Sequence, residues 1–277
     1  MNRILIAGAL LFISLFAEAQ LKTPAPSPTQ SLRQDFGLGN IELAYSRPSV
    51  RGRKVYGDLL PYGQVWRTGA NSATTISFTD EVIIGGKKIP AGKYGLLSIP
   101  GAKQWIMIIS KQTDVTSPAD YNVDQDMVRV NVSSVKSKSS TETFTLSIQD
   151  IKPTSCNLVL SWEKRSVSLP IQTEIESKIM ANIDAAMKTE KPPYYNAAMY
   201  YMDNGKDLNQ ALVWLDKAIE SNATAFWIHY QRANCLAKLG RKEEAKAGAE
   251  KSKQLATAAK NGDYVKLNEK LIAELNK

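Results

Sequence analysis

The sequence predicts an α+β protein of two folded parts, an antiparallel β-sandwich of jelly-roll-like form followed by an α-helical repeat domain. Three observations lead to this prediction. Apolar residues alternate with polar ones in many short runs from Thr29 to Pro170, which is typical of half-buried strands. At Thr173 the period changes to that of an amphipathic helix. Beyond Tyr194 the pattern repeats after 34 or 35 residues.

The first 19 residues have the features of a secretory signal peptide. Arg3 provides the positive start, an apolar run follows, and Ala17-Glu18-Ala19 suits cleavage before Gln20. Residues 20–30 then form a Pro-rich leader. The apolar run is shorter than the roughly 20 residues that a membrane span needs, and no later segment is apolar enough. We therefore expect an exported protein without a transmembrane segment, periplasmic if the source is Gram-negative.

Residues 31–171 are predicted to form the β domain. Val82–Ile84 and Lys87–Ile89 flank Gly85-Gly86, which is typical of a hairpin because glycine tolerates the positive φ of a two-residue turn. No helical crossovers separate the strands, so an antiparallel arrangement is favoured. Besides this hairpin, strands are expected at Ile41–Tyr45, Thr74–Thr79, Lys93–Ile99, Trp105–Ile109, Met127–Val132, Phe144–Ile148, Cys156–Trp162 and Ser166–Ile171.

Residues 172–191 are predicted to form a bridging helix. Thr173 and Glu176 match a capping box, in which each side chain bonds to the other residue's backbone N–H. Apolar residues recur at four-residue steps over Glu174–Thr189, and Pro192-Pro193 then ends the helix.

Residues 192–277 contain an internal repeat. Ala198 aligns with Ala233 and Gly205 aligns with Gly240, each 35 residues later. A small residue where two helices meet and a glycine at their turn resemble the tetratricopeptide repeat. An amphipathic segment at Asp263–Leu275 is expected to cap the stack. Such arrays present a concave helical surface, so we expect a protein partner there.

The remaining composition disfavours several function classes. The net charge is +8, but the lysines are scattered, so nucleic-acid binding is not expected. The one histidine, His229, holds a packing position in the repeat, and no nucleotide, redox or serine-hydrolase motif is present. We expect no cofactor and no metal. Cys156 and Cys235 fall in different domains and are predicted to be buried free thiols.

The strongest candidate for a binding site is a cluster of arginines interleaved with aromatic residues between positions 45 and 67. Guanidinium groups suit carboxylate, phosphate or sulfate, and they stack on aromatic rings. The polar loop Lys111–Tyr121 is expected to form one wall of a pocket. Residues predicted to bind an anionic or glycan ligand are Arg47, Arg51, Arg53, Arg67, Trp66, Asn71, Lys111 and Asp114. Alternatively, the arginines pair with Asp35, Glu42 and Asp58 and tie loops to the sandwich.

Four motifs in this region resemble an exported bacterial family, domain of unknown function 2911. They are Ser46–Arg53 (SRPSVRGR), Tyr62–Asn71 (YGQVWRTGAN), Ile89–Leu96 (IPAGKYGL) and Ser110–Asp114 (SKQTD). The resemblance spans roughly Thr29 to Ile171. It implies an exported β domain, sometimes followed by tetratricopeptide-like helices, and it implies no reaction.

Three functions stay open at this point. The favoured one is a binding protein, with a small anionic or glycan ligand in the β domain and a protein partner on the helices. The second is an envelope hydrolase acting on sugars or peptides, with Asp58, Asp114 or Asp120 in acid and base roles. The third is a purely architectural protein without a small-molecule pocket.

Overall fold

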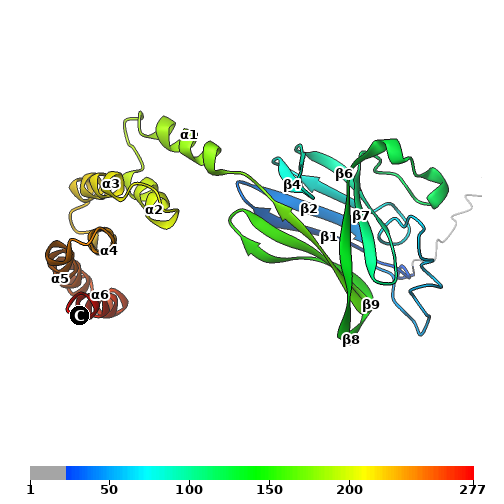
Figure 1. The fold of residues 1–277 in the computed structure, drawn as a ribbon. Helices are drawn as coiled ribbons and strands as arrows, with labels where there is room; N and C mark the ends of the chain where they lie inside the picture. The colour runs from blue at the N-terminus through cyan, green and yellow to red at the C-terminus, as the bar shows by residue number, and fades with distance from the viewer. Residues whose placement is uncertain (1–22) are drawn as a thin grey trace, which may run out of the picture. The chain divides into compact units, whose positions relative to one another are not determined.

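The protein's computed structural model describes residues 23–277. The chain divides between Ile175 and Glu176 into two compact units, here called the β unit and the helical unit (Figure 1). The signal peptide expected at residues 1–19 lies outside the described residues, as do the first residues of the leader.

All strands of the β unit belong to one antiparallel sheet. Its order is β1-β2-β3-β6-β7-β8-β9-β4-β5. The described strands are β1 (Thr29–Phe36), β2 (Gly39–Ser46), β3 (Thr75–Phe78), β4 (Val82–Ile84), β5 (Lys87–Ile89), β6 (Gly92–Ile99), β7 (Gln104–Ser110), β8 (Asp126–Lys152) and β9 (Ser155–Gln172). The antiparallel β domain is thus confirmed, and the β4–β5 hairpin has the predicted bounds.

Strand β8 joins the two parts of the sheet. It pairs with β7 up to Ser133 and with β9 from Ser134 onward (Figure 1). The sequence predicted two separate strands within this range. They are continuous because the intervening stretch, Ser134–Thr143, contains no glycine or proline, so nothing forces a turn. Register shifts along the β8–β9 pairing mark where the strands bend.

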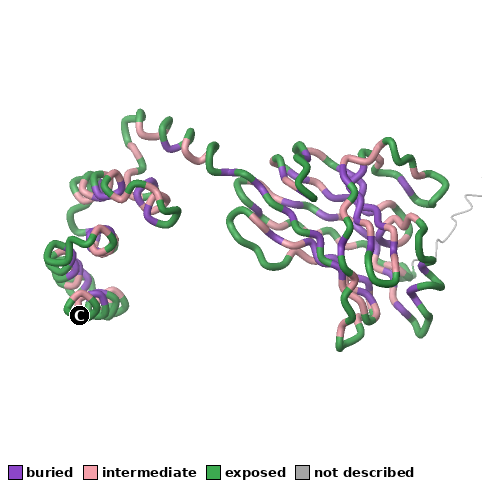
Figure 2. The backbone as a smooth tube through the Cα atoms, viewed as in Figure 1, coloured by how far each residue is buried: buried purple, intermediate pink, exposed green. Residues whose placement is uncertain are grey.

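The sheet folds back on itself, so that β2 faces β8 across a hydrophobic core. The Tyr45 hydroxyl accepts a hydrogen bond from the Leu146 N–H at 2.9 Å, and a β-bridge joins Ser49 to Thr143. Buried aromatic rings fill the space between, each removing roughly 150–250 Å² from water. The largest of the fully buried rings are those of Trp105 and Trp162. Buried residues recur along the strands of the β unit, whereas its loops are mostly exposed (Figure 2).

The predicted capping box at Thr173 is wrong. The Thr173 hydroxyl donates to the Glu81 carbonyl oxygen at 3.1 Å, and its N–H donates to the Thr154 carbonyl. Thr173 therefore lies just beyond the end of β9 and is held by the β unit, and the first helix begins at Glu176. The side chain bonds to Glu81, just before β4, and this partner far along the chain outweighed the local pattern.

The described part of the helical unit contains six helices: α1 (Glu176–Ala186), α2 (Tyr194–Asp203), α3 (Leu208–Ser221), α4 (Phe226–Lys238), α5 (Lys242–Ala258) and α6 (Gly262–Leu275). Alanines at the contacts between helices are fully buried, and these are Ala198, Ala211, Ala233 and Ala245. Gly205 and Gly240 adopt positive φ just beyond α2 and α4, as glycine does after helix ends. No described helix combines the length and apolar character needed to cross a bilayer.

Candidate functional site

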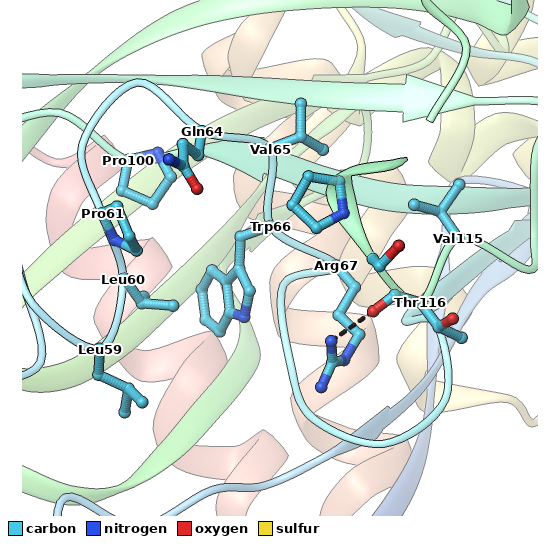
Figure 3. A pocket seen from close by; sticks show the side chains of 12 residues that line it. Leu59, Leu60, Pro61, Gln64, Val65, Trp66, Arg67, Pro100, Val115 and Thr116 are labelled. Atoms are coloured by element: carbon cyan, nitrogen blue, oxygen red, sulfur yellow. Dashed lines mark hydrogen bonds between the residues drawn. The ribbon is translucent and has the colours of Figure 1, made fainter. Parts of the chain in front are cut away.

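A small cleft of about 160 Å³ opens between two loops of the β unit (Figure 3). One loop follows Val55 and leads to Trp66, and the other follows β7. The lining residues are Leu59, Leu60, Pro61, Gln64, Val65, Trp66, Arg67, Pro100, Val115, Thr116, Ser117 and Pro118. Of the loop Lys111–Tyr121, which was expected to form one wall of a pocket, residues 115–118 line this space. We call this space the Trp66–Arg67 cleft.

Trp66 is held firmly between the core and the cleft. Its backbone N–H and C=O pair with Ser98 at 2.7 and 2.9 Å, and its indole N–H donates to the Gly69 carbonyl. The ring stacks on Trp162, with centroids 5.8 Å apart and planes inclined by 15°. The ring remains partly exposed. It therefore offers the cleft a fixed apolar surface.

Arg67 lies beside Trp66 in the same cleft, and its guanidinium is only partly engaged (Figure 3). One terminal amino group donates to the Thr116 carbonyl, which links the two loops. The Nε atom is buried and has no partner among the described residues. A buried donor without a partner costs roughly 1–3 kcal/mol. The second terminal amino group also makes no hydrogen bond among the described residues, but it is not a buried atom, so an anion in the cleft can reach it.

The turn after Arg67 is locally strained and tightly packed. Thr68 is β-branched yet has a φ of +52°, a conformation that such residues rarely adopt. Its hydroxyl donates to the Ser98 Oγ at 2.9 Å, which fixes the turn against β6. A Cβ at Gly69 would lie 2.7 Å from the Thr74 Oγ1 and 3.1 Å from the Ser46 carbonyl oxygen, so this position needs glycine.

The second loop is seated on β6 through another close approach. A Cβ at Gly95 would lie 2.0 Å from the Gln112 carbonyl oxygen, so only glycine lets the loop lie on the strand. Asp120 accepts hydrogen bonds from the N–H groups of Ser117 and Thr116 and from the Thr116 hydroxyl, which lowers the pKa of its carboxyl. Its carboxylate therefore shapes the cleft wall.

A buried acid at the end of this loop was missed by sequence reasoning. The Asp126 side chain is only 6% exposed, and it accepts a hydrogen bond from the Tyr121 hydroxyl. Burial raises the pKa of Asp126, which the Tyr121 bond and the Arg129 charge at 3.8 Å oppose. Burial and the Asp126 contact raise the pKa of Tyr121 to about 12. In the sequence, the only sign of this buried acid was an acidic residue at the start of an apolar strand.

Two of the predicted arginines are engaged by the β unit's own backbone. The Arg47 guanidinium donates to the Phe144 carbonyl at 3.0 Å and to the Thr145 hydroxyl at 2.8 Å. Arg53 donates to two carbonyl oxygens of its own loop, three and four residues earlier. Neither side chain lines the Trp66–Arg67 cleft.

Arg51 and Asn71 hold the Pro-rich leader. The Arg51 guanidinium donates to the Pro26 carbonyl at 2.9 Å, and the Asn71 amide donates to the Ser27 carbonyl at 3.2 Å. The structure therefore separates the four predicted arginines, and Arg67 alone of them lines the cleft. Within residues 23–277 none of the four forms an ion pair with an acid, so the alternative pairing with Asp35, Glu42 and Asp58 is not seen either.

The other predicted polar residues lie away from the cleft. Lys111 and Asp114 are exposed, and neither is among the lining residues; the same holds for Asp58. In the part of the chain that the structure describes, no Asp or Glu lines the cleft. The paired carboxylates that the hydrolase alternative requires are thus not brought together there.

The thiols and the metal-binding residue types offer no second site among the described residues. Cys156 and Cys235 are free and buried, as predicted, and burial raises the pKa of the Cys156 thiol to about 11. No group of three or more His, Cys, Asp or Glu side chains lies close enough to hold a metal ion within residues 23–277.

The fold and the site define a class of protein: an antiparallel β unit with a loop-built cleft, followed in the same chain by a helical unit. Residues 27–171, more than half of the chain, match the family described as "Protein of unknown function (DUF2911)". The chain belongs to this family, as the motifs indicated. Neither a curated protein nor a solved structure matches the chain.

Proposed function

We propose that this is an exported binding protein, and that the Trp66–Arg67 cleft holds a small anionic or glycan ligand. The observation that carries the proposal is the partly free guanidinium of Arg67 beside the fixed ring of Trp66. Binding sites are typically concave and apolar, with a few well-placed polar groups that orient the ligand. This cleft has that composition, whereas the carboxylate pair of the hydrolase alternative has no support there.

The test compares two arginines of similar sequence context. Phosphate, acetate and N-acetylglucosamine are titrated into isotope-labelled protein, and amide shifts are followed by NMR. We expect at least one probe to shift the residues lining the cleft in the wild type and in Arg53→Met, and to shift them far less in Arg67→Met. If no probe moves these resonances, or if Arg67→Met responds like the wild type, the proposal fails.

We further propose that the β sheet closes as a jelly-roll-like sandwich and that the helical unit is tetratricopeptide-like and binds a protein partner. The contacts between β2 and β8 support the first part. The buried alanines and the glycines after α2 and α4 support the second. A groove of about 460 Å³ on the helical unit carries charges of both signs, which suits a polar protein surface. Its charged side chains are Asp216, Arg232, Glu244 and Lys251.

Export is part of the same proposal. It rests on the signal-like sequence of residues 1–19. Mass spectrometry of the protein purified from its native host is expected to show a chain that begins at Gln20. A chain that retains Met1, found in the cytosolic fraction, would contradict export.

A further inference from the structure

The lining of the Trp66–Arg67 cleft narrows the class of ligand. Most of its residues are apolar, and three of them are prolines, which are Pro61, Pro100 and Pro118. The side chains that can hydrogen-bond are those of Gln64, Arg67, Thr116 and Ser117. A sugar ring carries hydroxyls around its whole edge, and each hydroxyl buried without a partner costs about 1–3 kcal/mol. The cleft therefore suits an apolar group better than a glycan.

The charge that lines the cleft favours a ligand with one negative charge. Arg67 is the one cation among the described lining residues, and no acid is among them; the Asp120 carboxylate accepts hydrogen bonds from the N–H groups of Thr116 and Ser117 behind the wall. The Arg67 Nε–H is buried, but the second amino group of Arg67 is not a buried atom and has no hydrogen-bond partner within residues 23–277. This amino group can donate a charge-assisted hydrogen bond to a carboxylate oxygen. A phosphate ion would place a larger charge, with no apolar part, against Leu60, Val65 and the prolines.

The size of the cleft limits the apolar part of the ligand. A volume of about 160 Å³ has room for a single large side chain and not for an extended chain. Leu59 and Tyr62 lie on the loop between Val55 and Trp66, and their exposed fractions are 41% and 42%. These side chains offer apolar surface on which the remainder of a ligand can lie.

We infer that the cleft recognises an apolar residue that bears a free carboxylate, either the carboxyl-terminal residue of a peptide or an acylated amino acid. The inference rests on the proposed function. The carboxylate pairs with Arg67, and the apolar side chain lies against Trp66, Leu60 and Pro61. The Gln64 amide is placed on the lining to bond with the ligand's own amide group.

The test uses N-acetylphenylalanine and its amide, which differ only in the negative charge, with isothermal titration calorimetry on the full chain. We expect the wild type to bind the acid at least tenfold more tightly than the amide. Arg53→Met should keep this preference, Arg67→Lys should weaken it, and Arg67→Met should bind both probes equally. Far-ultraviolet circular dichroism checks that each variant is folded.

A second arm separates the two sources of the ligand. A six-residue peptide ending in phenylalanine should bind as tightly as N-acetylphenylalanine if the cleft takes peptide ends, and should fail to bind if it takes free acylated amino acids. Equal affinity of the wild type for acid and amide would overturn the inference, without reliance on any variant. Binding of N-acetylglucosamine or phosphate alone would overturn it and leave the proposed function standing, whereas failure of every probe would overturn both.

Discussion

Two segments of the β unit look alike in sequence and differ in what their arginines do. The arginine loop, Ser46–Arg53, and the tryptophan turn, Trp66–Asn71, both combine arginine with small and polar residues. In the first, Arg47 and Arg53 donate to several oxygens of the protein itself. In the second, the Arg67 guanidinium makes a single hydrogen bond and keeps its second amino group free beside a cleft.

In these two segments, the number of carbonyl oxygens within hydrogen-bond distance determines whether an arginine stabilises the fold or keeps N–H donors free for a ligand. A guanidinium has five N–H donors, and loops that leave carbonyls unpaired will use them. Where a guanidinium meets one carbonyl and an apolar wall, donors stay free.

The largest effect is expected from Gly95→Ala, which disturbs the wall opposite the tryptophan turn. The new methyl group would lie 2.0 Å from the Gln112 carbonyl, so the loop must lift from β6. Overpacking of this kind costs roughly 1–3 kcal/mol and occasionally more. Urea unfolding followed by tryptophan fluorescence measures the loss. Gly262→Ala, where the added atom meets nothing within 4 Å, is the matched control. A stable Gly95→Ala protein that still binds ligand would contradict this seating of the loop.

Arg47→Met should destabilise the arginine loop strongly. It removes two hydrogen bonds from a charged donor and leaves the Phe144 carbonyl without its partner. Hydrogen bonds to charged groups contribute roughly 1.5–3 kcal/mol, so a loss of about 2 kcal/mol in the free energy of unfolding is expected. The same urea titration measures it. An unchanged unfolding midpoint would show that the Arg47 side chain does not stabilise the fold.

The buried acid behind the cleft wall should make stability depend on pH. Burial raises the pKa of Asp126, so the folded chain holds the proton more tightly than the unfolded chain. This contribution is fully present below the ordinary carboxyl pKa of 3.8 and is lost as pH rises through the raised value. Between about pH 3 and about pH 7, the wild type should therefore lose stability relative to Asp126→Asn, which is measured as the difference between their free energies of unfolding at each pH.

Tyr121→Phe sharpens this prediction, because it removes a hydrogen bond that opposes the raised pKa of Asp126. The pH at which the wild-type contribution is lost should then move upward in this variant. A difference between wild type and Asp126→Asn that is flat with pH would contradict the buried position of the acid.

The smallest effect on stability is expected from Arg67→Met. It removes one hydrogen bond to Thr116 but also removes a buried Nε–H that lacks a partner, and the two effects largely cancel. We expect a change within about 0.5 kcal/mol in the free energy of unfolding, together with loss of ligand binding. A destabilisation as large as that of Arg47→Met would show that Arg67 stabilises the fold as Arg47 does, and would contradict the difference between the two segments.

Local patterns predicted much of the fold. The hairpin at Val82–Ile89 and the helices with glycine after their ends follow from turn chemistry and periodicity, which act over a few residues. Strand β1, the continuity of β8, the true role of Thr173 and the joining of Cys156–Trp162 and Ser166–Ile171 into the single strand β9 were not predicted, because each depends on a partner elsewhere in the chain.

The candidate site was predicted in part for the same reason. Trp66, Arg67 and the loop after Lys111 were placed at the site by residue type and spacing. The cleft's apolar lining by Leu59, Leu60 and Pro100 was not, since these residues are ordinary in sequence and meet only in space. The use of Arg47, Arg51 and Arg53 by backbone carbonyls could not be read from a sequence, because every residue has such a carbonyl.

The most direct test is an NMR spectrum of the arginine Nε–H groups, recorded while N-acetylphenylalanine is added to the folded chain. The Arg67 signal is assigned by its absence in Arg67→Lys. We expect this signal to shift as the probe binds, while the signals of Arg47 and Arg53 stay in place. A shift of the Arg47 or Arg53 signal with an unchanged Arg67 signal would contradict the conclusion that Arg47 and Arg53 stabilise the fold while Arg67 binds the ligand.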